Sequence, residues 1–231
     1  MTTQDAKRCN VTMLVMLTLL PLAVIAGQLA VGAKGMLGYS VYKIALLVPP
    51  LVYCRVAGVE VFGDILKLSN WGNGLKWSVA LGLLAIAIFW SVYYTLGELL
   101  LDKQMITAKI DRQFSVNATS VFLVAPITIA LNSLLEEFFY RGFAFGLLVR
   151  RCTVVGFVLP AVAFTVQHLL FIYHWLTPLP LAIAVVGLLV FAFVLEKVYA
   201  ATDTIVAPWL IHIFGDIAMM GIAVSLIFWG K

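Results

Sequence analysis

Two adjacent glutamates and an arginine interrupt a strongly apolar stretch of the chain. Glu136, Glu137 and Arg141 lie within six residues, whereas residues 121–135 carry no charge and residues 143–149 are wholly apolar. A charge at the centre of a membrane helix costs at least about 2.5–3.5 kcal/mol on insertion scales, so these charges should be paired or functional. On a helix, Glu137 and Arg141 share a face, while Glu136 lies about 100° around the helix from Glu137. The pattern predicts one paired carboxylate and one free to face a cavity; a juxtamembrane salt bridge beside a spare acid is the alternative.

Two of the three histidines lie inside apolar segments, where they could act together with such a carboxylate. His168 follows Phe164 by four residues and His212 precedes Asp216 by four, so each pair shares one face of a helix. The third, His174, stands at the predicted end of a segment, where an interfacial position accounts for it. A single intramembrane histidine is more often a packing residue than a catalyst, but two of them with an aspartate favour a site.

The acidic and imidazole side chains come from three separate apolar segments. Ionisable groups within a bilayer normally face the interior of a helix bundle or a water-filled cavity. A converging set made of Glu136, His168, His212 and Asp216 could activate a water molecule, relay protons or bind a metal ion. Helical periodicity does not choose among these three.

The composition identifies the class of protein. The chain has 231 residues, of which 63% are hydrophobic and 11% charged, and its mean hydropathy is +1.07. A soluble domain of this length could not bury so much apolar surface, so we expect one integral membrane domain over residues 1–231. The net charge of +4 is spread thinly, which excludes nucleic acid as a partner and favours contact with lipid headgroups. Cys9, Cys54 and Cys152 are expected to be free thiols.

Several apolar stretches could span the membrane and position these groups. A membrane helix needs about 20 apolar residues. The candidates are residues 11–32, 39–57, 77–101, 114–149, 153–174, 178–199 and 203–229. Residues 114–149 are too long for one straight span at about 1.5 Å per residue, so the stretch should protrude, break or bend, and Pro126 is the expected place for a break. Glu196 and Lys197 fall near the end of the 178–199 stretch. We therefore predict an all-α polytopic transmembrane bundle of about seven spans, between six and eight.

The charged and histidine motifs together resemble a known family, the intramembrane proteases typified by the CAAX prenyl-protein endopeptidases and their bacterial relatives linked to bacteriocin self-immunity. The first family motif, Glu-Glu-x-x-x-Arg, matches residues 136–141. The second, Phe-x-x-x-His, matches residues 164–168, and the third, His-x-x-x-Asn or Asp, matches residues 212–216. The resemblance covers residues 114–228, which would form a conical or cavity-forming catalytic core.

The resemblance implies a glutamate-dependent endopeptidase of the cell membrane that works without an obligatory metal or cofactor. Glu136 would be the general base that activates water, and His168 would hold and polarise that water. Glu137, Arg141 and Phe164 would support them, and His212 and Asp216 would stand where the family stabilises the oxyanion. The expected substrate is a membrane-associated peptide or protein tail. General-base catalysis typically contributes about 10²–10⁴ in rate, and one oxyanion donor about 10²–10³.

Asp216 departs from the prenyl-protein branch of the family, which has asparagine at this position. An asparagine can donate a hydrogen bond to an oxyanion, whereas an ionised aspartate repels it. Asp216 could donate only if its apolar surroundings keep it protonated; otherwise it could orient His212 or help to bind a metal.

Two other hypotheses remain open from the residues alone. A zinc-dependent protease could use the glutamate, histidine and aspartate side chains as ligands, although the chain contains no His-Glu-x-x-His pair. A proton-coupled transporter or membrane scaffold could use the same set as a relay or as structural pairs. Transporters of this kind usually carry broken helices in both halves of the chain, whereas the polar groups here gather in one half.

Overall fold

The computed structural model is a bundle of helices. It describes residues 11–30, 45–53, 55–56, 71–114 and 117–229, and within these ranges there is no β-strand. Five of the described helical segments are long and apolar enough to cross a membrane: Gly74–Leu100, Val121–Leu148, Thr153–Trp175, Pro178–Thr202 and Val206–Trp229. Helices suit a bilayer because they satisfy their backbone hydrogen bonds internally. The prediction of an all-α, multi-pass membrane protein is confirmed.

The amino-terminal part of the bundle is described only in part. Helix α2, Val11–Ala30, contains the shorter apolar helix Val11–Gly27, and residues 45–53 are also helical. The rest of the predicted span at residues 39–57 lies largely outside the described residues, as do Cys9 and Cys54. Cys152 is a free cysteine, as predicted.

Of the three outcomes expected for the long stretch at residues 114–149, the structure shows protrusion from the span. Helix α5, Lys103–Phe114, ends where the stretch was expected to begin. The Asn117 side chain accepts hydrogen bonds from the backbone N–H groups of Thr119 (2.9 Å) and Ser120 (3.1 Å), and this turn starts a new helix at Val121. The excess length is therefore taken up by a turn outside the span.

Pro126 does not break the new helix, so the break expected at this residue is wrong. The segment continues without interruption through α6 (Val121–Ile127), the wide π-helix η1 (Thr128–Asn132), α7 (Ser133–Glu137), the second π-helix η2 (Phe138–Phe145) and α8 (Gly146–Leu148). Proline is tolerated inside membrane helices because local widening of the helix can satisfy the backbone groups that it frees. Here η1 begins two residues after Pro126.

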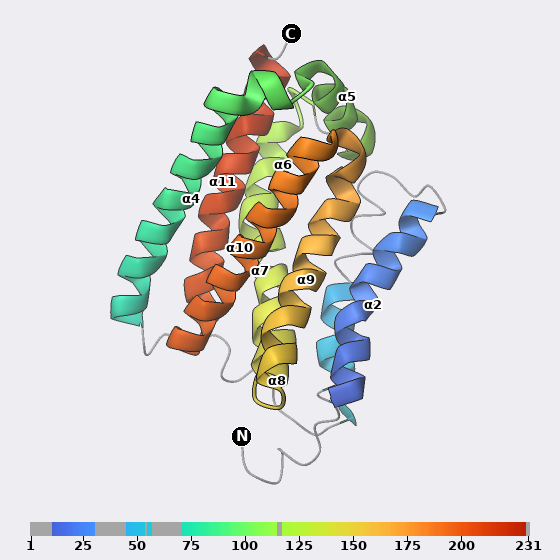
Figure 1. Ribbon diagram of the computed structural model, residues 1–231, viewed down its shortest axis with the longest axis vertical. Coiled ribbons are helices and arrows are strands. Elements are labelled where there is room, and N and C mark those ends of the chain that lie inside the picture. Colours follow the sequence, from blue (N-terminus) through green and yellow to red (C-terminus); the bar gives the residue numbers. More distant parts are fainter. Residues whose placement is uncertain (1–10, 31–44, 54, 57–70, 115–116, 230–231) are drawn as a thin grey trace.

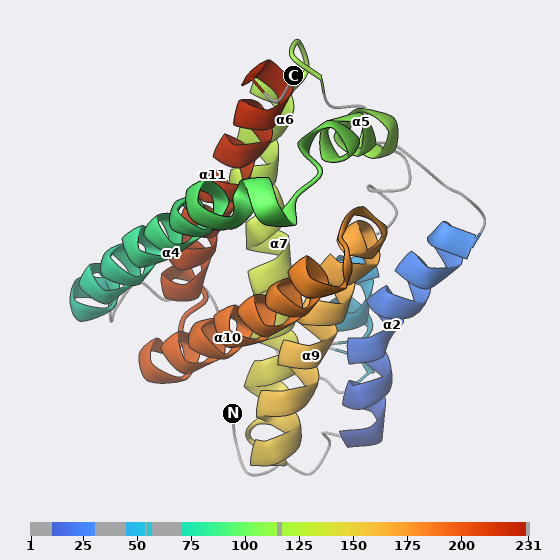
Figure 2. The same cartoon turned by 45° about the horizontal axis from the view of Figure 1, so that its top comes forward.

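The other long helices pack beside this segment without enclosing it (Figures 1 and 2). Helix α4, Trp71–Leu100, runs along α11, Val206–Trp229. Helix α9, Thr153–Ile172, packs against both α2 and α10, Pro178–Thr202. Along the central segment, α7 contacts α11, while η2 contacts α9 and α10. Buried aromatic rings of η2 itself, such as those of Phe139 and Phe143, fill the space between this helix and its neighbours.

Two local features set the position of α11. Asp203 has a left-handed backbone conformation, with φ of 50°, and its N–H donates to the Tyr199 carbonyl at 2.8 Å. This cap ends α10 and turns the chain back within three residues. Gly82 of α4 then allows close contact, because a Cβ atom at this position would lie 2.4 Å from the ring of Phe214.

Candidate active site

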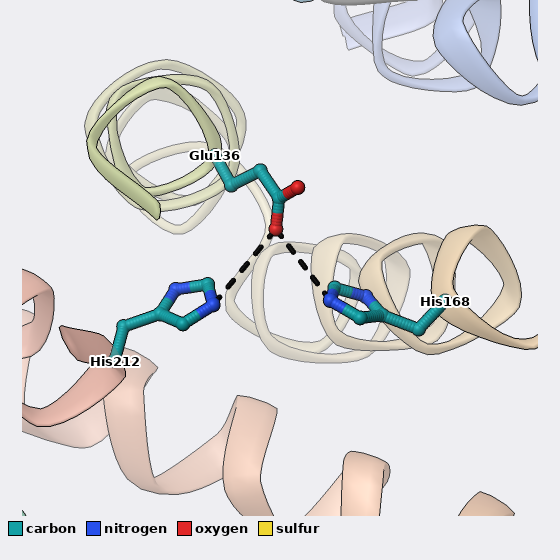
Figure 3. A group of neighbouring side chains, drawn as sticks. All are labelled: Glu136, His168 and His212. Carbon is teal, nitrogen blue, oxygen red and sulfur yellow. Dashed lines mark ion pairs between the residues drawn. The ribbon is translucent and has the colours of Figure 1, made fainter. Parts of the chain in front are cut away.

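Residues from three separate spans meet in the interior of the bundle (Figure 3). Glu136 comes from α7, His168 from α9 and His212 from α11. Glu136 Oε2 lies 3.5 Å from His168 Nε2 and 3.9 Å from His212 Nε2. Glu136 and His212 are buried, whereas the His168 side chain is 28% exposed. Access to the group is therefore greatest at His168.

Glu136 is held by the helix that carries it. Its other carboxylate oxygen, Oε1, accepts a hydrogen bond from Asn132 Nδ2 at 3.0 Å. Asn132 is the last residue of η1, and η2 begins directly after Glu137, so the two glutamates stand between two stretches of widened helix. Such widened turns are frequent at functional sites. The arrangement fixes Oε1 and turns Oε2 toward the two imidazoles.

Glu137 is the centre of a second, fully buried set of contacts. Its Oε1 accepts hydrogen bonds from Arg141 Nη1 at 3.0 Å and from His212 Nδ1 at 2.8 Å. The ion pair expected from the four-residue spacing is present. Arg141 also donates to the Ala192 carbonyl at 3.4 Å, and its guanidinium lies 4.4 Å from the centre of the Phe164 ring. Glu137 therefore connects the arginine to one of the site histidines.

The partners of the two imidazoles define their hydrogen-bonding state. His168 Nδ1 lies 2.9 Å from the Phe164 carbonyl, which can only accept, so this nitrogen carries the proton. His212 Nδ1 likewise faces the Glu137 carboxylate. In the neutral rings, Nε2 then holds the lone pair, and both Nε2 atoms point toward Glu136. Phe164 thus contributes its backbone carbonyl as well as its ring.

Asp216 stands at the edge of the group. Its Oδ1 lies 3.8 Å from His212 Nε2, which is beyond hydrogen-bonding distance, and its side chain is 18% exposed. Asp216 lies one helical turn after His212 on α11 and faces Nε2 of His212, the same nitrogen that Glu136 faces. The position suits a residue that acts on a bound molecule or on His212 through water.

The three central residues also fit a metal ion. Glu136, His168 and His212 each offer one ligand atom, and these atoms lie within 4.8 Å of one another. Two histidines and one glutamate with an open fourth position are a known catalytic zinc set. The carbonyl and the carboxylate on the Nδ1 atoms are the usual outer partners of metal-bound histidines. The residues could therefore hold zinc, with Asp216 outside the ligand group.

Glu196 is a buried acid that belongs to none of the three sequence motifs. It stands beside Lys197 near the end of α10, but its side chain is fully buried and lies in the electrostatic field of Arg141 and Glu137. Neither of its carboxylate oxygens has a hydrogen-bond partner among the described residues. Helical spacing from the buried residues Ala192 and Tyr199 would have placed Glu196 on the inner face of α10.

Comparison with known proteins identifies the same part of the chain. Residues 118–218 match the protein family described as type II CAAX prenyl endopeptidase, Rce1-like. No curated protein and no solved structure matches the chain significantly. The matched range contains all three motifs that suggested the resemblance, so the resemblance is confirmed for these residues.

Proposed function

We propose that the Rce1-like domain at residues 118–218 makes this membrane protein a glutamate-dependent intramembrane endopeptidase, with Glu136 as its general base. The observation that supports this most strongly is the approach of two imidazole Nε2 atoms to one buried carboxylate oxygen, Glu136 Oε2. Glu136 also lies near the middle of the 28-residue segment Val121–Leu148. Hydrolysis would then take place well inside the bilayer.

In the proposed mechanism, a water molecule binds between Glu136 Oε2 and His168 Nε2. Glu136 removes one proton from this water as its oxygen attacks the carbonyl carbon of the peptide bond. The resulting oxyanion is stabilised by His212, which in its imidazolium form donates from Nε2 while Nδ1 stays bonded to Glu137. Glu136 then passes its proton to the leaving amine, and the peptide carbon–nitrogen bond breaks.

The proposed substrate is a membrane-associated tail of the kind named in the family description, a prenylated cysteine followed by three residues. A prenyl chain partitions into lipid and would bring the peptide bond to the site from the bilayer. The cell membrane is the proposed location.

The direct test is cleavage by the purified protein in lipid nanodiscs. A farnesylated peptide ending in Cys-Val-Ile-Met and its unprenylated counterpart would be incubated with wild type and with His168→Ala, and products would be identified by mass spectrometry. Wild type is expected to release the last three residues from the farnesylated peptide, and His168→Ala should not. Equal cleavage by both proteins, or no cleavage of these peptides or of a wider peptide library, would overturn the proposal.

A zinc-dependent protease is the second candidate, because the ligand atoms of Glu136, His168 and His212 lie so close together. Zinc would polarise the substrate carbonyl and lower the pKa of a bound water. Elemental analysis and a chelator series distinguish the two candidates. Glutamate-dependent catalysis keeps its activity in chelator, whereas activity that is lost in chelator and restored by zinc would establish the second candidate.

Replacing Asp216 by asparagine tests how this residue takes part. An amide can donate a hydrogen bond and does not repel an oxyanion, so Asp216→Asn is expected to keep kcat within about tenfold of wild type. The loss of one oxyanion donor would lower kcat by more, about 10²–10³-fold. Asp216→Ala should lose more. Complete loss in Asp216→Asn would show instead that the negative charge of Asp216 is required.

A further inference from the structure

Trp209 of α11 reaches across to the helix that carries Glu136. Its indole Nε1–H donates to the Ala130 carbonyl at 3.2 Å and to Ser133 Oγ at 3.1 Å. The Ser133 hydroxyl in turn donates to the Ile129 carbonyl. Both carbonyls belong to η1, and Ser133, which is fully buried, is the first residue of α7. The Trp209 indole therefore binds the chain at the junction between the π-helix η1 and α7, the helix that carries Glu136.

This wide turn determines which side chain faces the histidines. A π-helical turn closes its hydrogen bonds at five residues instead of four, so it takes up one extra residue. One residue corresponds to about 100° of rotation around a helix. If η1 relaxed to a regular α-helix, everything after it would rotate by this amount relative to α6, and Glu136 would leave the position in which its Oε2 faces His168 and His212.

Trp209 also lies three residues before His212 on α11. Its hydrogen bonds therefore join the helix of one site histidine to the helix of the glutamate. The contact between Glu136 Oε2 and His212 Nε2, at 3.9 Å, is too long to be a direct hydrogen bond. The alignment of the two groups must then be maintained by other contacts between α11 and the η1–α7 segment, and these are the bond from His212 Nδ1 to Glu137 and the two bonds of Trp209.

We propose that Trp209 and Ser133 are positioning residues that hold η1 in its widened form and thereby align Glu136 with His212. This role rests on the proposed function for its kinetic consequences, whereas the hydrogen-bond network itself does not depend on it. Tryptophan is common at membrane interfaces, where its N–H binds water or headgroups. Here the same N–H binds two acceptors of the protein, which favours the positioning role.

The kinetic test uses Trp209→Phe, which removes the N–H and keeps an aromatic ring, and Ser133→Ala, which removes the hydroxyl. Trp77→Phe is the matched control, because Trp77 is 69% exposed on α4 and distant in sequence from the site. Misalignment of about 1 Å can cost 10²-fold in rate, so Trp209→Phe is expected to lower kcat by about 10–100-fold with KM little changed. A Trp209→Phe kcat equal to that of Trp77→Phe, or a rise in KM alone, would overturn the proposal.

A second readout does not need any activity. Thermal unfolding in detergent is measured for both single variants and for the double variant Trp209→Phe/Ser133→Ala. Because the two side chains share the bond between Trp209 Nε1 and Ser133 Oγ, the fall in melting temperature of the double variant is expected to be smaller than the sum of the two single falls. Melting temperatures that fall additively would show that the two residues act separately and would reject the network, even if no peptide substrate had been found.

Discussion

Glu136→Gln is expected to abolish peptide cleavage, with kcat lowered by about 10²–10⁴ or more, the usual contribution of a positioned general base. Glutamine has nearly the same size, and its side-chain oxygen can still accept the hydrogen bond from Asn132 Nδ2. It cannot take a proton from water, however. The variant should therefore bind the peptide with little change in affinity and fail at the chemical step, which single-turnover cleavage in nanodiscs would measure.

The control for this variant is Glu98→Gln. Glu98 is also an acid on a membrane-spanning helix, but its side chain is 83% exposed and pairs with Lys103 at the end of α4. The Glu98→Gln variant is expected to cleave the peptide at the wild-type rate. If Glu136→Gln retained more than about a tenth of wild-type kcat, which is far above the residual rate expected without a general base, Glu136 would not be the base.

Arg141→Gln is expected to lower the free energy of unfolding by about 3–5 kcal/mol, the usual effect of removing one partner of a buried ion pair. Arg141 is fully buried, and it is paired with Glu137 while lying in the electrostatic field of Glu196. Its removal takes the guanidinium away from Glu137 and removes the positive charge that lies near Glu196. Denaturant unfolding in mixed micelles would measure the loss, and cleavage should fall with it because Glu137 also holds His212.

Two further variants test whether the loss of stability in Arg141→Gln is caused by the loss of its charge. Arg141→Gln/Glu196→Gln should be more stable than Arg141→Gln alone, because the amide of Gln cannot place a second negative charge near Glu137 once the arginine is gone. Arg150→Gln is the control for loss of an arginine, since Arg150 forms an exposed pair with Asp203 at 3.6 Å, and such pairs contribute about 0–1 kcal/mol. If Arg141→Gln were as stable as Arg150→Gln, or if Glu196→Gln lowered the free energy of unfolding of Arg141→Gln still further, the buried charge cluster would not be important for stability.

The sequence by itself determined the class of fold and the contacts within single helices. Its apolar composition predicted membrane helices because a bilayer admits few other backbone arrangements. The four-residue spacings predicted that Glu137 would pair with Arg141 and that Phe164 would lie beside His168, and both contacts are present. Such predictions succeed because residues four apart on a helix are neighbours whatever surrounds the helix.

Only the tertiary structure decided the contacts between helices. The bond between Glu137 and His212, the burial of Glu196 and the reach of Trp209 to η1 all depend on how each helix is rotated and how deep it lies against its neighbours. The continuity of the helix past Pro126 likewise depends on the widened turn that follows it. Helical periodicity fixes the angle between side chains on one helix, but packing fixes the angle between helices, and packing joins residues that are far apart in the chain.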